Sequence, residues 1–128
     1  MVEVLLWHGS QRVRLLALVD SGADSSLIDV SYAEVLGLDM NRAQQVDAIT
    51  AAGTPMTCFT WPGRQLELQF EDRRFPFEGS FAQFPPDSDG MNLLGRKDFF
   101  KEYIIQFWDA AELMNIDVSP DHPRPGAP

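Results

Sequence analysis

The sequence predicts an all-β fold with one or two short helices. Short segments in which apolar and polar residues alternate recur along the chain, most clearly from Leu66 to Phe70. Clusters of turn-forming residues separate these segments. Helical signals are confined to two short stretches, one after Ser31 and one over residues 96–102. We therefore expect strands to build the domain and helices to serve only as connections.

The composition indicates a single folded domain. A chain of 128 residues that is 45% hydrophobic can bury a substantial core, and it contains no apolar run of the ~18 residues that a membrane span needs. The net charge of −9 opposes binding to nucleic acid or to an anionic membrane. Cys58 is the single cysteine, so an internal disulfide is excluded and burial as a small hydrophobe is expected. We see no secretory signal, so a cytoplasmic location is expected.

The first two strands are expected to form a hairpin. Residues 2–7 and 12–19 flank a turn at residues 8–11. Residues 15–19 are an unbroken apolar run, Leu-Leu-Ala-Leu-Val, which predicts a strand buried on both faces. The strand therefore starts at the surface and ends in the core.

This apolar run ends abruptly at Asp20. Ser21 and Gly22 follow it, and a hydroxyl and a glycine after a buried strand indicate a tight loop. An ionised carboxylate at the floor of a core is costly unless it is hydrogen-bonded, paired or able to share a proton. Asp20 is therefore a candidate for a chemical role.

The two predicted helices have different signals. Ser31 and Glu34 have the spacing of a capping box, and Gly37 is placed to end the helix. The second helix, over residues 96–102, is expected to turn its phenylalanines inward.

A second hairpin is expected after the first helix. Its strands cover residues 44–50 and 56–61, and small residues with one glycine and one proline form the tip at 51–55. A tip of this composition has little to pack against and is expected to be mobile.

The strand at residues 66–70 is expected to turn back into one return strand that carries several phenylalanines. Gly79 predicts a bulge or bend in this return strand. The aromatic residues are expected in the core: Phe75, Phe77, Phe81 and Phe84.

The C-terminal third begins with a loop at residues 85–90. Its acidic residues lack the spacing of a calcium-binding loop, so a solvated turn is expected. A second buried segment follows at 92–95, and residues 103–108 and 113–118 are expected to form a closing hairpin. Residues 119–128 are expected to form a flexible Pro-rich tail.

Two motifs together resemble a known family. Asp20-Ser21-Gly22-Ala23-Asp24 resembles the active-site loop of the retropepsin-like aspartic proteases, the single-lobe relatives of pepsin. Met91-Asn92-Leu93-Leu94-Gly95-Arg96 resembles the later signature of that family. The similarity extends over residues 2–118 and is greatest to small non-viral members, bacterial or retrotransposon-derived. It implies a closed or partly open β-barrel of acid-protease type over residues 1–118.

The resemblance implies an aspartic endopeptidase that hydrolyses extended polypeptide with an activated water. Such chemistry needs two carboxylates, one to take a proton from water and one to polarise the peptide carbonyl. The chain holds one Asp-Ser-Gly motif, so the resemblance implies a homodimer in which each subunit contributes Asp20. Ser21 and Gly22 complete the catalytic loop, and no metal or cofactor is implied.

Other residues take supporting roles by the same resemblance. The expected substrate-binding residues are Ala23, Asp24, Ala52 and Gly53. The expected structural supports are Leu94, Gly95 and Arg96, and Arg96 is expected to form a buried or half-buried ion pair with Asp24. The extension after residue 102 differs from the interleaved chain ends of retroviral members, so the resemblance does not define how two copies meet.

Three other interpretations follow from the same residues. The first is a catalytically silent binding or scaffolding module with the same fold. The second is a phosphodegron-like signal at Asp-Ser-Gly-x-x-Ser, which would have to be exposed, whereas apolar residues flank this one. The third is a serine hydrolase, which the absence of Gly-x-Ser-x-Gly and of an evident histidine base disfavours.

Overall fold

The structure is a computed structural model that describes residues 1–49, 53, 55–84, 91–108 and 113–118. In the last two strands only Tyr103 and Ile116 are described beyond the backbone. The predictions for Ala52, for the loop at 85–90 and for the tail at 119–128 lie outside the described residues.

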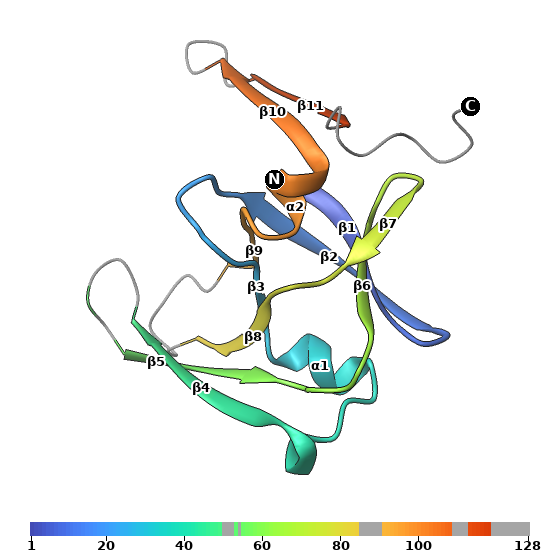
Figure 1. Cartoon of the computed structure of the whole chain (residues 1–128), viewed down its shortest axis with the longest axis vertical. Helices are drawn as coiled ribbons and strands as arrows, with labels where there is room; N and C mark the ends of the chain where they lie inside the picture. The colour runs from blue at the N-terminus through green and yellow to red at the C-terminus, as the bar shows by residue number, and fades with distance from the viewer. Residues whose placement is uncertain (50–52, 54, 85–90, 109–112, 119–128) are drawn as a thin grey trace.

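Strands dominate the described part of the chain (Figure 1). They are β1 (Val2–His8), β2 (Gln11–Val19), β3 (Leu27–Asp29), β4 (Gln44–Ile49), β5 (Pro55–Thr60), β6 (Leu66–Phe70), β7 (Arg73–Pro76), β8 (Ser80–Gln83), β9 (Leu93–Leu94), β10 (Tyr103–Trp108) and β11 (Leu113–Val118). The helical elements are α1 (Ser31–Val35), the short 3₁₀ helix η1 (Met40–Arg42) and α2 (Phe99–Glu102). No helix in the described ranges is long and apolar enough to cross a bilayer.

Nine strands form one sheet in the order β4-β5-β8-β3-β9-β2-β1-β6-β7. Most neighbours are antiparallel, but β9 runs parallel to β2 and β8 runs parallel to β3. The sheet bends around the main hydrophobic core, a smaller cluster of Met56, Cys58 and Ala82 lies between β5 and β8, and β4 and β7 are the sheet edges (Figure 1). The prediction of an all-β, partly open barrel with short helices is therefore confirmed.

The core is aromatic where the sheet meets α2. Phe70, Phe75, Phe99 and Tyr103 pack edge-to-face or tilted, with ring centroids 4.8–6.4 Å apart. These rings join β6, β7, α2 and β10. The β10–β11 hairpin is a separate two-stranded sheet that stands beside α2, away from the main sheet (Figure 1).

The prediction that residues 15–19 are buried on both faces is wrong. Leu15, Ala17 and Val19 are buried, whereas Leu16 is 54% exposed and Leu18 is 38% exposed. The strand alternates like an ordinary half-buried strand, because the described residues form no second layer over the outer face of β2. An apolar face is thus left at the surface next to Asp20.

The capping box predicted for α1 does not form. Val30 is the N-cap residue and makes no side-chain hydrogen bond, while Asp29 Oδ1 accepts a hydrogen bond from the Ser31 amide at 2.9 Å. The prediction for Gly37 is confirmed, since its φ of +75° ends the helix. The second helix begins later than predicted, because residues 96–98 form a turn before α2.

The predicted return strand is two strands. β7 pairs with β6, and β8 lies several strands away between β5 and β3. Gly79, in the break between them, packs so closely that an added Cβ would lie 2.2 Å from the carbonyl oxygen of Ser26. The sequence pattern also did not predict β3, which is three residues long. Phe75 and Phe81 are buried as predicted, and Phe77 and Phe84 are half-buried.

Candidate active site

The loop between β2 and β3 folds tightly around the Asp20 carboxyl group. The Asp20 amide donates to the Leu94 carbonyl at 3.0 Å, which fixes the end of β2 against β9. The Asp20 carbonyl accepts from the Ala23 amide at 3.1 Å, and Asp20 Oδ1 accepts from the Gly22 amide at 2.9 Å. Main-chain donors therefore orient a carboxylate that is half-buried in the single chain.

The tip of this loop is open to solvent. Ser21, Gly22 and Asp24 are exposed, and Ala23 is half-buried. A Cβ added to Gly22 would lie 3.2 Å from Asp20 Oδ1, so a larger residue would crowd the carboxylate. The predicted catalytic residues Asp20, Ser21 and Gly22 thus lie together at the surface.

The predicted supports lie directly behind the loop. Leu94 is fully buried, and the amides of Arg96 and Lys97 donate to the carbonyls of Ala23 and Asp24 at 3.0 and 2.9 Å. Gly95 lies so close to the loop backbone that an added Cβ would be 2.6 Å from the Ser25 carbonyl carbon. The segment from 94 to 97 therefore holds the loop through main-chain bonds.

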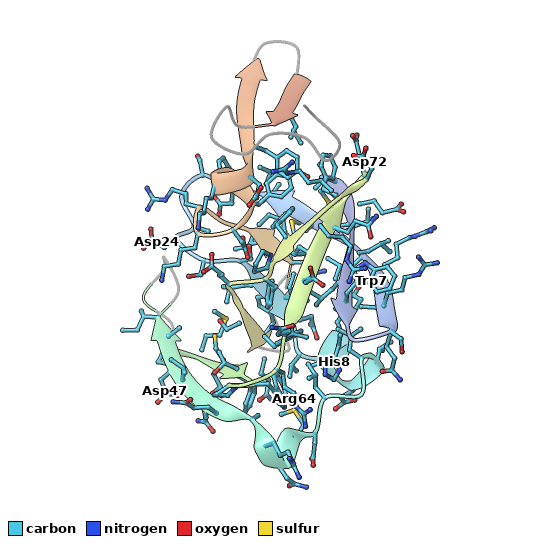
Figure 2. All side chains as sticks on the ribbon, turned by 45° about the vertical axis from the view of Figure 1, so that its right-hand side comes forward. Trp7, His8, Asp24, Asp47, Arg64 and Asp72 are labelled. Atoms are coloured by element: carbon cyan, nitrogen blue, oxygen red, sulfur yellow. The ribbon has the colours of Figure 1, made fainter. Side chains whose placement is uncertain are left out.

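Arg96 and Asp24 form an ion pair between Nη2 and Oδ1. The pair differs from the buried or half-buried pair that the sequence predicted, because the Arg96 side chain is 59% exposed and that of Asp24 is 75% exposed. Figure 2 shows Asp24 at the outer edge of the molecule. In one isolated chain this pair is a surface contact.

Sequence reasoning missed a buried polar pair behind the loop. Ser26 Oγ donates to Asp98 Oδ1 at 2.5 Å, and both residues are almost completely buried. Burial raises the pKa of the Asp98 carboxyl group, and its hydrogen bonds to Ser26 and to two main-chain amides lower it in part. The sequence does contain a signal for this position. Asp98 directly precedes Phe99 and Phe100, and an acid in that place is a common N-cap residue, which is the role Asp98 has in α2.

Asn92 makes a second buried link that sequence reasoning did not single out. Its Oδ1 accepts from the Asp29 amide at 2.8 Å, and its Nδ2 donates to the Leu16 carbonyl at 2.9 Å. The side chain therefore ties β2 and β3 together on either side of the Asp20 loop.

An apolar strip leads along the outer face of β2 to Asp20. Leu16 and Leu18 share this face, and the Leu18 amide donates to the Asn92 carbonyl, which brings the 37% exposed Met91 close. Exposed apolar residues that lie together commonly mark a binding surface. The signal is present in the sequence as the apolar run of residues 15–19, which predicts burial on both faces.

The end of β4 and the start of β5 lie on the same side of the molecule as the loop between β2 and β3 (Figures 1 and 2). Ile49 at the end of β4 is 74% exposed, and Val46 is 44% exposed. Gly53 is exposed with a φ of +83°, a conformation that favours glycine.

One chain offers one oriented carboxylate beside an apolar surface. A carboxylate in this setting can accept a proton from water or, when protonated, donate a hydrogen bond to a carbonyl oxygen, but it cannot do both at once. Hydrolysis by carboxylates alone therefore requires a second carboxylate at the same place.

Comparison with known proteins identifies a family for this chain. A family model described as aspartyl protease matches residues 4–97 of the 128. Among solved structures, the EIAV protease complexed with the inhibitor HBY-793 is similar, with 19% sequence identity, a TM-score of 0.49 and coverage of 75% of this chain and 80% of that one. No match was found among curated proteins. Because the family model covers most of the sequence, including both motifs, this chain belongs to the aspartyl protease family.

Proposed function

We propose that this protein is an aspartic endopeptidase that works as a homodimer, with a dyad made of Asp20 from each copy. The observation that carries the proposal is the Asp20 carboxylate, held by the Gly22 amide in a loop whose tip is exposed. A second copy can reach this tip, because no part of the described chain covers Ser21 or Gly22.

The proposed reaction uses water as the nucleophile. Two carboxylates about 3 Å apart share one proton, so the pair titrates as a unit. The ionised Asp20 takes a proton from water while the protonated Asp20 donates to the scissile carbonyl oxygen. The resulting tetrahedral intermediate collapses when the leaving amine receives a proton from the dyad. Ser21, next to Asp20, is proposed to steady the loop.

The proposed substrate is an extended polypeptide with an apolar side chain near the cleaved bond. Leu18 presents apolar surface two residues before Asp20, and the exposed ends of the β4–β5 hairpin lie on the same side of the molecule. We assign substrate contact to Ala23 and Asp24, which follow Gly22 in the loop, and to Ala52 and Gly53, which lie between β4 and β5 in the sequence. An extended chain would bind there as an added strand.

The first test compares Asp20→Asn with Asp72→Asn, which makes the same chemical change in an exposed turn. Peptide libraries are incubated with each protein at acidic and neutral pH. The proposal predicts cleavage by the wild type and by Asp72→Asn, and loss of cleavage in Asp20→Asn. Cleavage that persists in Asp20→Asn would show that another group does the chemistry.

The second test asks whether the dyad is shared. Inactive Asp20→Asn is added to a fixed amount of wild type, and the copies are allowed to exchange. If each dimer needs two Asp20 residues, random pairing lowers activity to about half at equal amounts and to about a fifth at a fourfold excess. Unchanged activity would exclude a shared dyad. A chain that is monomeric and inactive at every concentration would favour the silent binding module.

A further inference from the structure

The return limb of the Asp20 loop is anchored by a hydrogen bond between residues far apart in sequence. Ser26 is 0% exposed and Asp98 is 2% exposed, and 72 positions separate them. The 2.5 Å contact from Ser26 Oγ to Asp98 Oδ1 is a hydroxyl–carboxylate bond, one of the strong kinds in proteins. A bond of this kind inside the core has little freedom to shift.

The same hydroxyl also connects to the segment that holds Asp20. The Gly95 amide donates to Ser26 Oγ at 3.0 Å, while the neighbouring Leu94 carbonyl accepts from the Asp20 amide. A continuous path of three hydrogen bonds and the Leu94–Gly95 peptide unit therefore runs from Asp98 through Ser26 to the backbone of Asp20.

Asp98 joins this path to two further segments. Its Oδ1 accepts from the Phe99 amide at 2.7 Å at the start of α2, and its Oδ2 accepts from the Glu78 amide at 3.1 Å. The loop, the start of α2 and the chain before β8 thus meet at one carboxyl group. Among the described residues, no buried polar side-chain atom lacks a hydrogen-bond partner, so the network is fully satisfied.

We infer that Ser26 and Asp98 are positioning residues that hold the Asp20 loop in its working geometry. The inference rests on the proposed function for the role of Asp20, but the restraint itself is a property of the fold. Neither residue has a hydrogen bond to the Asp20 carboxyl group, so both act through the loop backbone.

The experiment uses Ser26→Ala and Asp98→Asn, with Glu102→Gln as the matched control. Ser26→Ala removes one oxygen, adds no volume and leaves the Gly95 amide without its acceptor. Asp98→Asn turns an NH₂ group toward a main-chain donor. Glu102 is also a buried acid of α2, but its ion pair is with Arg73 of β7 and not with Ser26 or Gly95. Ser26→Thr restores the hydroxyl and is the rescue variant.

Amide hydrogen exchange across residues 18–28 is the readout that does not depend on activity. We expect exchange of the loop amides to rise about tenfold or more in Ser26→Ala and Asp98→Asn, as expected when a buried bond to a charged group is lost. We expect no such local rise in Glu102→Gln. Because Glu102→Gln removes one partner of a buried ion pair, the rise at residues 18–28 is compared with the rise in the rest of the same chain. A rise that is even along the chain in Ser26→Ala and Asp98→Asn, or a loop-specific excess of the same size in Glu102→Gln, would overturn the inference. If Ser26→Thr does not fold, the comparison of the other three proteins still decides.

Peptide cleavage separates this inference from the proposed function. We expect kcat to fall about tenfold or more in Ser26→Ala and Asp98→Asn while KM stays within about twofold, because geometry at the dyad changes and the substrate surface does not. A rise in KM with kcat unchanged would overturn the positioning role. If the wild type does not cleave peptides, the proposed function fails, and the exchange pattern still tests the restraint.

Discussion

Arg73 of β7 and Glu102 of α2 form a buried ion pair. Arg73 Nη2 lies 3.0 Å and Nε lies 3.2 Å from Glu102 Oε2, and their side chains are only 12% and 11% exposed. Losing one partner leaves the other charge in the core without this contact, which costs about 3–5 kcal/mol in comparable pairs. We predict such a loss in the free energy of unfolding for Arg73→Met, measured by urea denaturation.

The double variant Arg73→Met/Glu102→Met is the control for that measurement. Replacing both charges by apolar side chains removes the buried charge that has lost this contact, so the double variant should be more stable than Arg73→Met alone. If the double variant were less stable than the single one, the main loss in the free energy of unfolding would come from the missing ion pair and not from the charge that remains in the core.

Gly95 should tolerate no side chain. A methyl group there would lie 2.6 Å from the Ser25 carbonyl carbon and 2.9 Å from the Ala23 carbonyl oxygen, both of them main-chain atoms. Gly95→Ala should therefore cost about 1–3 kcal/mol through overpacking. Gly9→Ala is the control, since no atom lies within 4 Å of an added Cβ there and the only cost is the strain of an alanine at a φ of +60°. Urea midpoints that fall by the same amount would contradict the steric argument.

The exposed pair of Arg96 and Asp24 should matter little for the stability of a single chain. Both side chains are more than half exposed, and surface pairs contribute about 0–1 kcal/mol. Arg96→Ala should therefore shift the urea midpoint only slightly under conditions where the chain is monomeric. A loss of several kcal/mol would show that the pair is buried in solution, by a second copy for example.

Asp98 should make the fold less stable as pH rises. Burial raises the pKa of its carboxyl group in the folded chain above the ordinary 3.8, so the folded chain binds the proton more tightly than the unfolded chain. This stabilising contribution is complete below 3.8 and is lost as pH rises through the raised pKa. The segments that pack around Asp98 also carry charged groups, namely Glu78, the Arg73–Glu102 pair and the Arg96–Asp24 pair.

Asp98→Asn should remove this component of the pH dependence. We predict that the difference in free energy of unfolding, wild type minus Asp98→Asn, is largest near pH 4 and shrinks toward neutral pH. Urea denaturation at several pH values measures it. A difference that grows with pH would show that the ionised carboxylate is the form that the fold prefers.

Self-association should strengthen with salt. Each chain carries a net charge of −9, so two copies repel one another at neutral pH, and salt screens this repulsion. Lowering the pH toward the isoelectric point of about 4.4 should act in the same direction. Sedimentation of Asp20→Asn across salt and pH measures the association constant without self-cleavage. Association that weakens with salt would indicate an interface held by complementary charges.

The sequence by itself determined the strand content and the main motif. Alternation at residues 66–70 and turn residues between strands predicted the sheet, because a half-buried strand requires that period. The Asp20-Ser21-Gly22 run predicted the tight loop after β2, because an acid, a hydroxyl and a glycine end an apolar strand, and it made Asp20 a candidate for a chemical role. Gly37 ended α1 as expected, since a positive φ is a local property of the chain.

The tertiary structure decided which apolar residues are covered. Residues 15–19 are apolar on both faces, but only the fold reveals that nothing in the described chain lies over Leu16 and Leu18. The same holds for β3, whose three residues become a strand because β8 and β9 pair with them and not because of their own pattern. Short strands carry too little local signal to be recognised alone.

The tertiary structure also decided how the Asp20 loop is held. Ser26 and Asp98 lie 72 positions apart, and no local rule links a serine in one loop to an acid before a distant helix. Their bond exists because β9 inserts between β2 and β3 and brings the start of α2 to the loop. Local residues thus specify which groups are present, whereas long-range pairing specifies which of them meet, since contact across a sheet depends on strand order and not on sequence distance.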